Sequence, residues 1–456
     1  MQSLIRQMSK LKMTRAFGRV ASIRGLVVEV SGPISHLAIG AQLAITMKGQ
    51  GDQQLMCEVV GFRDRFAVCL AYGALTGVKP GDVAEFLEME PVLHPSDGWI
   101  GRVLDGLGNP IDGKGVLPAG PVAQSLAEPP PPPHQRNLVE VPLDLGVRAF
   151  NTFLPCCSGQ RMGIFAGSGV GKSMLMSMLA RNGKADISVI GLIGERGREV
   201  QEFLVKTLGS EGLKNSVLVV ATSDAPALMR RQAAYTTLAL AQYFSARGRE
   251  VLCLMDNLTR FAQAQREIGL SGGEPPTTKG YPPSVFSELP RLLERAGPGR
   301  QGQGNITGLF AVLVEGDNTN EPVSDTVRGI LDGHVVLSRD IAERGRFPAI
   351  DVLASVSRTF TEALSPEHQV LVAQAKLLMA RYRDMEELIR LGAYRTGSDA
   401  LTDEAVKFIP QIEKFLSQSQ HDTSSIDESF AVLREILSQA TVSAAESGAA
   451  GTGAAD

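Results

Sequence analysis

The stretch FAGSGVGKS, residues 165–173, constrains the fold of this chain more than any other. It follows an apolar run, residues 162–165, that predicts a short buried strand, and it precedes residues 174–180, which predict a helix. A strand, a Gly-rich loop and a Lys-Ser pair that opens a helix form the context of a phosphate-binding loop. Glycines let successive backbone N–H groups point at one anion, and the helix N-terminus adds partial positive charge. We expect Lys172 to reach the phosphates and the Ser173 hydroxyl to bind Mg²⁺.

The loop departs from its usual form at one position. The motif begins with glycine in most proteins, and this chain has Ala166 there. A methyl group is tolerated at this position if the residue adopts a negative φ. The predicted nucleotide-binding residues of the loop are Ala166, Gly167, Ser168, Gly169, Val170, Gly171, Lys172 and Ser173.

A second motif is the apolar run VLCLMD, residues 251–256, which predicts a buried strand that ends in Asp256. Ligands of open α/β sheets bind at the carboxyl ends of the strands, so we expect this carboxylate near the phosphate-binding loop. There it can hold the water shell of Mg²⁺.

A third motif, GERGREV at residues 194–200, follows the strand-like run 187–193. ATP hydrolysis needs a group that orients and polarises the attacking water. Glu195 lies at the expected end of the strand and is our candidate. Glu199 is the competing choice, although it lies further into the helix that follows.

Strand-like and helical patterns alternate from about residue 138 to residue 347. This alternation predicts an α/β domain whose mainly parallel sheet is covered on both faces. The predicted strands are residues 162–166, 187–193, 217–221, 251–256 and 309–314.

The flanking regions have other patterns. Between residues 18 and 88, short apolar runs separated by Gly and Pro predict a small β-barrel, and beyond Pro366 the pattern is helical. Residues 129–133 are five prolines, which predict an extended spacer. The predicted domains are an N-terminal partner-binding helix at 1–17, the barrel at 18–90, the nucleotide domain at 91–365 with a linker at 91–137, a helical domain at 366–440, and a disordered tail at 441–456.

The first 15 residues predict a short amphipathic helix with an apolar stripe and a basic face. The first acidic residue of the chain is Glu29. Such a segment can dock on a partner or on an anionic lipid surface; the alternative is a frayed, solvated terminus. The stripe consists of Leu4, Ile5, Met8 and Leu11, and the basic residues are Arg6, Lys10, Lys12 and Arg15.

The composition narrows the possible functions. A net charge of −4 argues against bulk nucleic-acid binding. The five cysteines contain no C-x-x-C pair and indicate reduced thiols in a cytosolic protein, and the six histidines are too scattered for a zinc site. No apolar run approaches the roughly 18 residues that span a bilayer, so we expect no membrane insertion by the chain itself.

Residues 348–357, PAIDVLASVS, match the signature P-[SAP]-[LIV]-[DNH]-x-x-x-S-x-S at every fixed position. Together with the phosphate loop, they make the chain similar to the hexameric rotary ATPase superfamily, which includes the catalytic and nucleotide-binding subunits of ATP synthase. The resemblance covers about residues 18 to 416. It implies an N-terminal β-barrel, a central RecA-like α/β domain with the phosphate loop, and a helical C-terminal domain.

The resemblance also implies roles for individual residues. Glu195 matches the catalytic glutamate and Asp256 the metal-site aspartate. Arg358, directly after the signature, matches the arginine that enters the neighbouring subunit's site and stabilises charge on the transferred phosphoryl group. The other matches are Arg260 and Arg196 near the terminal phosphate, and Phe347 and Tyr394 beside the adenine.

Four stretches, residues 222–231, 280–291, 314–322 and 331–338, resemble the ATPases of type III protein export. This branch implies a Mg²⁺-dependent ATPase that acts as a homohexamer and energises or gates export. It also implies a cytoplasmic protein at the inner-membrane export apparatus. The implied partners are a stator-like regulator at the N-terminus, export-gate membrane components, a stalk protein and chaperone–substrate complexes. Residues 16–33 look more flagellar than injectisome-like.

Three alternatives remain open at the level of sequence. One is an injectisome ATPase, and another is an ATP synthase subunit that works only in a hetero-oligomer with a rotor. A third is a ring-shaped RNA translocase of related fold, which predicts base-stacking aromatics and basic residues in the barrel. The barrel region carries Phe62 and Phe66 flanking Arg63 and Arg65. We nevertheless expect no nucleic-acid partner.

Overall fold

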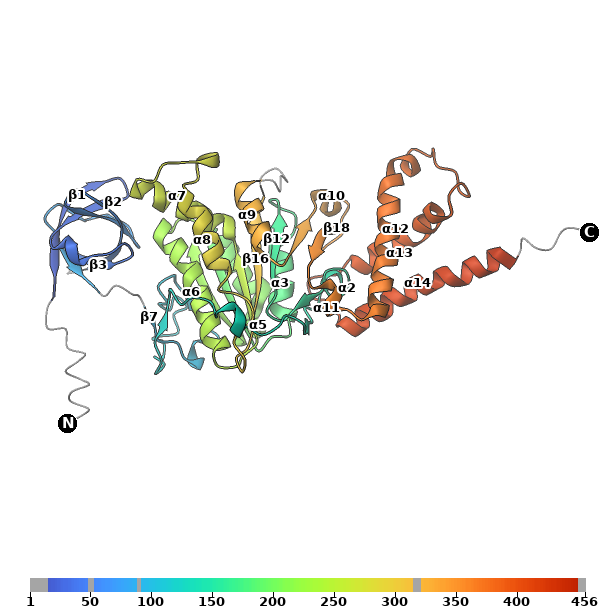
Figure 1. Cartoon of the computed structure of the whole chain (residues 1–456), viewed down its shortest axis with the longest axis horizontal. Helices are drawn as coiled ribbons and strands as arrows, with labels where there is room; N and C mark the ends of the chain where they lie inside the picture. The colour runs from blue at the N-terminus through green and yellow to red at the C-terminus, as the bar shows by residue number, and fades with distance from the viewer. Residues whose placement is uncertain (1–14, 48–52, 88–91, 315–320, 450–456) are drawn as a thin grey trace, which may run out of the picture.

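The computed structural model of the chain describes residues 15–47, 53–87, 92–314 and 321–449. The described residues form a β-barrel, a central α/β domain and a group of C-terminal helices, which follow one another along the long axis of the molecule (Figure 1). This arrangement confirms the predicted fold class. The predicted N-terminal helix lies almost entirely outside the described residues.

Six strands close the barrel in the order β1-β2-β5-β4-β3-β6. Their apolar side chains fill the interior, in which Val28, Leu43 and Val59 are fully buried. A second apolar cluster joins the barrel to the central domain, because Tyr72 packs with Leu228 and Ile268. The strands are β1 Phe17–Arg24, β2 Val27–Ser31, β3 Gln42–Thr46, β4 Gln54–Arg63, β5 Phe66–Ala71 and β6 Val83–Phe86.

The central sheet has eight strands in the order β18-β17-β12-β16-β15-β13-β14-β8. All neighbouring pairs are parallel except β17 and β18. Near-continuous apolar runs are typical of parallel strands that are buried on both faces. The strands are β8 Val103–Leu104, β12 Arg161–Ala166, β13 Ile187–Glu195, β14 Ser216–Thr222, β15 Val251–Asp256, β16 Ile306–Leu313, β17 Gly333–Leu337 and β18 Ile350–Ser357.

Helices cover both faces of this sheet and create two apolar cores. One core contains α3 and joins the C-terminal helices, and the other contains α6, α7 and α8. Figure 1 shows α6 and α8 in front of the strands. The helices are α3 Lys172–Asn182, α4 Gly197–Glu202, a π-helix at Phe203–Leu208, α5 Gly209–Lys214, α6 Ala227–Ser245, α7 Leu258–Gly272, α8 Pro283–Leu293 and α9 Pro322–Ile330.

The C-terminal region is helical, as its sequence predicts. It consists of α12 Pro366–Arg390, α13 Ala400–Leu416 and α14 Ile426–Ala449. The last helix continues into the segment that we predicted to be disordered from residue 441 onward. α14 ends at Ala449, and three of the nine residues at 441–449 are alanine, which has the highest helix propensity of all residues. Residues 450–456 lie outside the described part.

Residues 91–137, predicted as a linker, contribute more structure than expected. β8 forms one edge of the central sheet, and β7 Val92–Leu93 pairs with β9 Gln124–Ser125. The proline run lies against α6, since the Gln242 side chain donates to the Pro129 carbonyl at 3.5 Å. Short elements elsewhere are α2 Arg148–Thr152, α10 Arg339–Glu343, α11 Phe360–Ala363, β10 Pro142–Leu143 and β11 Cys156–Cys157.

All five cysteines are free and buried. Burial raises the pKa of the Cys57 thiol to about 12. Within the described residues, no helix is long and apolar enough to cross a membrane.

Candidate active site

The phosphate-binding loop connects the end of β12 to the start of α3. Gly169 and Gly171 have φ angles of +80° and +91°, which explains glycine at these two positions. Ala166 is the last residue of β12, and among the described residues only Asp64 and Lys279 are non-glycine residues with positive φ. The methyl group of Ala166 therefore causes no backbone strain, as the sequence argument requires.

Lys172, the first residue of α3, lies between two carboxylates from neighbouring strands. Its Nζ atom is 3.2 Å from Oε1 of Glu195, at the end of β13, and also donates to Oδ1 of Asp256, at the end of β15. Asn257 donates a hydrogen bond of 2.6 Å to the same Glu195 oxygen. The lysine is buried, with 8% of its surface exposed. The carboxyl ends of the strands thus assemble the three residues that the separate motifs predict.

The protonation of these groups follows from burial and from their neighbours. Burial alone would lower the pKa of Lys172, but the charges of Asp256 and Glu195 outweigh it and keep the lysine charged. Burial would raise the pKa of Glu195, but the charge of Lys172 and a hydrogen bond with Glu199 lower it below its ordinary value. The pKa of Glu199 is raised, because it shares that hydrogen bond and is partly buried. Burial also raises the pKa of Asp256.

A cavity of about 490 Å³ opens in front of this cluster. Arg260 enters it from α7, which begins with a cap in which Asn257 accepts a hydrogen bond from the Arg260 backbone at 2.8 Å. A Cβ atom on Gly194, whose φ is +70°, would lie 2.7 Å from Cβ of Arg260. The predicted residues that line the cavity are Gly167, Ser168, Gly169, Gly171, Lys172, Ser173, Glu195, Arg196, Asp256 and Arg260.

The remaining predicted residues lie elsewhere. Phe347 lies beside the loop, since a Cβ on Gly171 would be 3.2 Å from its ring. Ala166 and Val170, two of the predicted residues of the loop, are buried. Tyr394 follows α12 and donates to Asp403 Oδ1 at 2.8 Å, so its hydroxyl is held within the helical domain, and it is not among the residues that line this cavity.

Arg358 lies at the opposite end of the sheet. Its backbone N–H donates to the carbonyl of Asp332, whose own N–H donates to the carbonyl of Arg161, the first residue of β12. The Gly-rich part of the phosphate loop follows Ala166, the last residue of β12. Five residue steps of a parallel strand span roughly 17 Å, so Arg358 does not reach the loop of its own chain.

Sequence reasoning missed several residues that line the cavity, and the one furthest along the chain is Gln420. It lies between α13 and α14, 247 positions after Ser173 (420 − 173 = 247). Gln418, two positions earlier, holds the connection between α13 and α14 in place, because its backbone N–H donates to the carbonyl of Phe347 at 2.8 Å. No sequence motif marks a neutral polar residue in such a connection, and only the packing of the helical domain brings it to the loop.

The fold and the cavity define the class of the protein: it is a P-loop nucleotide-binding protein with an acidic residue at the end of each of two neighbouring strands. Family models then match along the chain. The nucleotide-binding domain of the ATP synthase alpha/beta family matches residues 146–357, and its beta-barrel domain matches residues 20–88. The T3SS EscN ATPase C-terminal domain matches residues 364–435.

Comparison with similar proteins indicates the branch of the family to which the chain belongs. The chain is 53% identical to the flagellum-specific ATP synthase of Caulobacter vibrioides over 96% of this chain and 99% of that protein. It is 46% identical to the flagellum-specific ATP synthase of Bacillus subtilis over 95% of this chain and 98% of that protein. A solved structure of the assembled ATPase EscN from the enteropathogenic E. coli type III secretion system has a TM-score of 0.86 and 42% identity, covering 92% of this chain and all of that one.

The chain belongs to the ATP synthase alpha/beta family, within the branch of the flagellum-specific ATP synthases and type III secretion ATPases.

Proposed function

We propose that this chain is a Mg²⁺-dependent ATPase that forms a homohexameric ring and energises or gates the export of unfolded proteins through the flagellar type III apparatus. The observation that carries this proposal is the cluster of Lys172, Glu195 and Asp256 at the carboxyl ends of neighbouring strands, beneath a phosphate-binding loop. The identity of 53% to a flagellum-specific ATP synthase over almost the whole chain supports the assignment to export.

In this proposal the loop and Lys172 bind the phosphates of ATP. The lysine is held charged inside the protein, so binding replaces its carboxylate partners by phosphate oxygens. Arg196 and Arg260 are the other cations of the cavity and neutralise charge near the terminal phosphate. Phe347, beside the loop, and Tyr394 were both expected at the adenine; the position of Phe347 supports that role, and that of Tyr394 does not.

The residues present fit a magnesium ion bound together with ATP. The Ser173 hydroxyl and the Asp256 carboxylate both line the cavity, and they offer the oxygen ligands that Mg²⁺ prefers. Among the described residues, no group of three or more His, Cys, Asp and Glu could hold a metal alone, so the phosphates complete the site. When bound, Mg²⁺ neutralises negative charge on the phosphates.

Glu195 orients and polarises the attacking water. Its carboxylate, at the end of β13, lies 3.2 Å from Lys172, whereas Glu199 lies in α4 and pairs with Arg196 at 3.6 Å. This position supports Glu195 over Glu199. The hydrogen bond from Asn257 fixes the position of the Glu195 carboxylate.

Arg358 completes the site of a neighbouring subunit. It is exposed, and it lies roughly a strand's length from the loop of its own chain, which leaves a neighbouring site as its target. An arginine supplied in this way stabilises charge on the transferred phosphoryl group. The solved structure of assembled EscN shows that a relative with 42% identity assembles.

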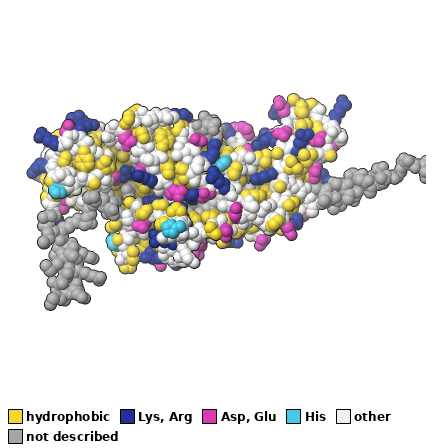
Figure 2. Space-filling view, in the orientation of Figure 1, with side chains coloured by type: hydrophobic (Ala, Val, Ile, Leu, Met, Phe, Trp, Pro, Cys, Tyr) yellow, Lys and Arg dark blue, Asp and Glu magenta, His cyan; other side chains and the backbone are white. Residues whose placement is uncertain are grey.

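The proposed setting is the cytoplasmic face of the inner membrane, at the export apparatus. The partners are a stator-like regulator at the N-terminus, a central stalk, export-gate membrane components and chaperone–substrate complexes. A structure of EscN in complex with its central stalk EscO supports the stalk. No nucleic-acid partner is proposed, because Arg63 pairs with Glu29 at 3.4 Å and the Arg65 guanidinium lies over Phe66. Figure 2 shows basic side chains on the barrel and mixed charges over the rest of the viewed face.

Export through an injectisome is the second candidate. It is favoured by 43% identity to the type 3 secretion system ATPase of Xanthomonas euvesicatoria over 96% of this chain. The identities of 53% and 46% to flagellar relatives are higher, and they favour flagellar export over injectisome export. A rotary ATP synthase subunit differs from both, because it would need other subunits for activity.

The experiment is an ATPase assay of the chain alone over a range of protein concentrations, with and without RNA. A homohexameric ATPase should hydrolyse ATP alone, with specific activity that rises with protein concentration, because assembly completes the site. Hydrolysis that appears only with other subunits would favour a rotary synthase subunit. Strong stimulation by RNA would favour a translocase and contradict the proposal.

A further inference from the structure

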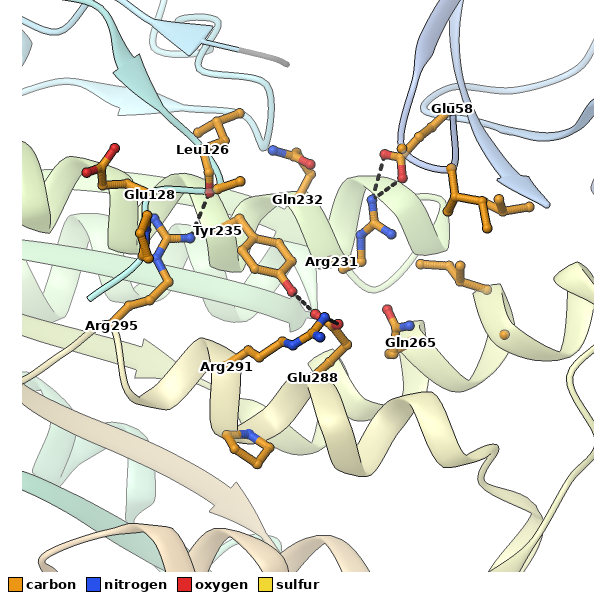
Figure 3. A pocket seen from close by; sticks show the side chains of 18 of the residues that line it. Glu58, Leu126, Glu128, Arg231, Gln232, Tyr235, Gln265, Glu288, Arg291 and Arg295 are labelled. Carbon is orange, nitrogen blue, oxygen red and sulfur yellow. Dashed lines mark hydrogen bonds and ion pairs between the residues drawn. The ribbon is translucent and has the colours of Figure 1, made fainter. Parts of the chain in front are cut away.

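A second and larger cavity lies between the barrel and the central domain. Its volume is about 960 Å³, and its walls come from the barrel, residues 126–130, α6, α7 and α8 (Figure 3). Apolar side chains form much of the wall, among them Val60, Leu126 and Ile268. Ile39, at the barrel side, is 71% exposed. None of the residues proposed to bind ATP lines this cavity.

Glutamates outnumber arginines in the wall of this cavity, with five against three. Glu294 is paired with Arg136 and Arg161, which lie outside the wall, so Glu128 and Glu274 are the glutamates of the wall that form an ion pair with no described residue. Glu58 pairs with Arg231 at 2.6 Å, and Glu288 accepts hydrogen bonds from Tyr235 and Arg291. Glu128 is exposed at the rim and forms no ion pair with any described residue. The negative charge of the rim is therefore open to a cationic partner.

The wall also contains a buried acceptor without a donor. Gln265, on α7, is 7% exposed, and its Oε1 atom has no hydrogen-bond partner in the described structure. Figure 3 shows this side chain among the residues that line the cavity. Leaving a buried polar atom unpaired costs free energy. Occupation of the cavity by a group with an N–H donor would recover that energy.

The N-terminal segment leaves the barrel next to this cavity. The Ala16 carbonyl accepts from Phe86, and the next residue of β6, Leu87, donates to the carbonyl of Gln42, the first residue of β3. Adjacent strands are about 4.8 Å apart, so the exit point lies roughly 10 Å from the start of β3. Ile39 and Gly40, which line the cavity, come directly before β3.

We propose that residues 1–14 dock in this cavity of their own chain. They carry Arg6, Lys10 and Lys12 and no acidic residue, which complements the acidic rim. Their apolar residues, Leu4, Ile5, Met8 and Leu11, match the apolar wall. Fourteen residues span about 21 Å as a helix, enough to reach the cavity from the exit point. The proposal goes beyond the proposed export function, because the segment then has an intramolecular site that competes with a regulatory partner.

Disulfide trapping in the full chain tests this docking. The native cysteines are all buried, so Met8→Cys can be combined with Ile39→Cys at the cavity. The matched control is Met8→Cys with Ser35→Cys. Ser35 is exposed and close to the exit point, because Gly32 packs against Phe17, but it does not line the cavity.

A free tether would give both cysteine pairs similar effective concentrations and similar rates. Docking predicts that the Ile39 pair cross-links several-fold faster than the Ser35 pair, within one chain and independently of protein concentration. Equal rates would overturn the proposal. Cross-linked dimers that increase with concentration would assign the cavity to a second copy of the chain and would also overturn it.

Limited trypsin digestion gives an independent readout without new cysteines. Trypsin cleaves after Lys10 and Lys12, and docking protects these sites. Glu128→Lys should speed cleavage by up to about fivefold, since it reverses an exposed charge at the rim. The matched control is Glu140→Lys, an exposed glutamate outside the cavity, which should leave the rate unchanged. Equal cleavage in the parent and the Glu128→Lys variant would contradict docking at this rim.

Discussion

The two ends of the central sheet both hold charged side chains, but they hold them differently. At the carboxyl ends, Lys172 lies between Glu195 and Asp256 and faces a cavity. At the amino ends, Arg161 pairs with Asp332 at 3.0 Å and with Glu294 at 2.5 Å. The first cluster can exchange its partners for a ligand, whereas the second joins elements of the fold to one another.

Arg358 is the exception at the amino ends. Its backbone N–H donates to Asp332, which pairs with Arg161. Its side chain, however, is exposed and makes no hydrogen bond or ion pair with any described residue. The carboxyl-end cavity already contains Lys172, Arg196 and Arg260. One chain thus holds three cations beside the phosphate-binding loop and an exposed arginine about a strand's length away. A ring that places the amino end of one sheet against the carboxyl end of the next would join them.

Arg358→Ala should have the largest effect on catalysis. An arginine finger contributes roughly 10³–10⁵ in rate, so turnover should fall by that order while ATP affinity remains near that of the parent chain. Arg390→Ala removes another exposed arginine, at the end of α12, and should leave turnover unchanged. Steady-state ATPase assays and nucleotide titrations measure both quantities.

Mixing Arg358→Ala with Lys172→Ala sharpens this prediction. Each variant alone should be almost inactive. In a mixed ring, some interfaces combine an intact loop from one chain with an intact Arg358 from its neighbour, and these should hydrolyse ATP. If the mixture co-assembles without recovering activity, Arg358 does not act on a neighbouring site.

Glu195→Gln should have the next largest effect. A neutral amide polarises water poorly, so turnover should fall by roughly 10²–10⁴ with ATP still bound. Glu199→Gln is the matched control, because it changes a shared hydrogen bond, worth about 1 kcal/mol or about fivefold, and an exposed ion pair with Arg196, which contributes little. Single-turnover assays at saturating ATP distinguish the two. The assignment of Glu195 would be wrong if Glu199→Gln were the slower enzyme.

The carboxyl-end site was largely predictable from sequence. Lys172, Glu195 and Asp256 each follow a recognisable strand, and parallel strands bring their carboxyl ends to one edge. The phosphate loop, the five inner strands and the barrel were predictable for the same reason, since local patterns of apolar residues and glycine determine them. Gln420 and the place of Tyr394 were not predictable, because they depend on how helices far along the chain pack.

No sequence pattern predicts the amino-end network, the ion pairs of Arg161 with Asp332 and Glu294 at the amino ends of the strands. Arg161, Glu294 and Asp332 are separated by 133 and 38 positions (294 − 161 and 332 − 294). Arg161 and Glu294 belong to no motif, and the stretch 331–338 that contains Asp332 predicts no ion pair. The antiparallel pair β17 and β18 was also missed as strands, because the residues of β18 were interpreted as a family signature. Long-range ion pairs of this kind follow from topology and can be found only in a structure.

Arg161→Met tests whether the amino-end network is structural. The substitution removes a guanidinium that is 12% exposed and leaves the carboxylate of Asp332 without its partner. We expect the free energy of unfolding to fall by about 1–3 kcal/mol, the range for losing hydrogen bonds to a charged group. Urea denaturation measures this loss, with Arg390→Met as an exposed control. ATP affinity should not change, and a loss of affinity equal to the loss of stability would show that the two ends are coupled.

Glu294→Gln should have the smallest effect, and its sign depends on pH. Burial would raise the pKa of Glu294, but Arg161 and Arg136 outweigh it and lower the pKa below its ordinary value. A lowered folded-state pKa gives stability that is present above the unfolded value, about 4.3, and is lost as the pH falls through the folded value. The side chain is 39% exposed, so the variant should lose no more than about 1 kcal/mol at pH 7.

The stability difference between the parent chain and Glu294→Gln should therefore shrink as the pH is lowered below about 4.3. Urea denaturation at a series of pH values measures it. A difference that grows on acidification would mean that Glu294 is protonated in the folded state and that the network is not an ion-pair network. In the Arg161→Met background the effect of Glu294→Gln should be smaller, because one of its two arginines is gone. Equal effects in both backgrounds would assign the stability to Arg136 alone, whose Nη1 atom is 3.1 Å from Glu294.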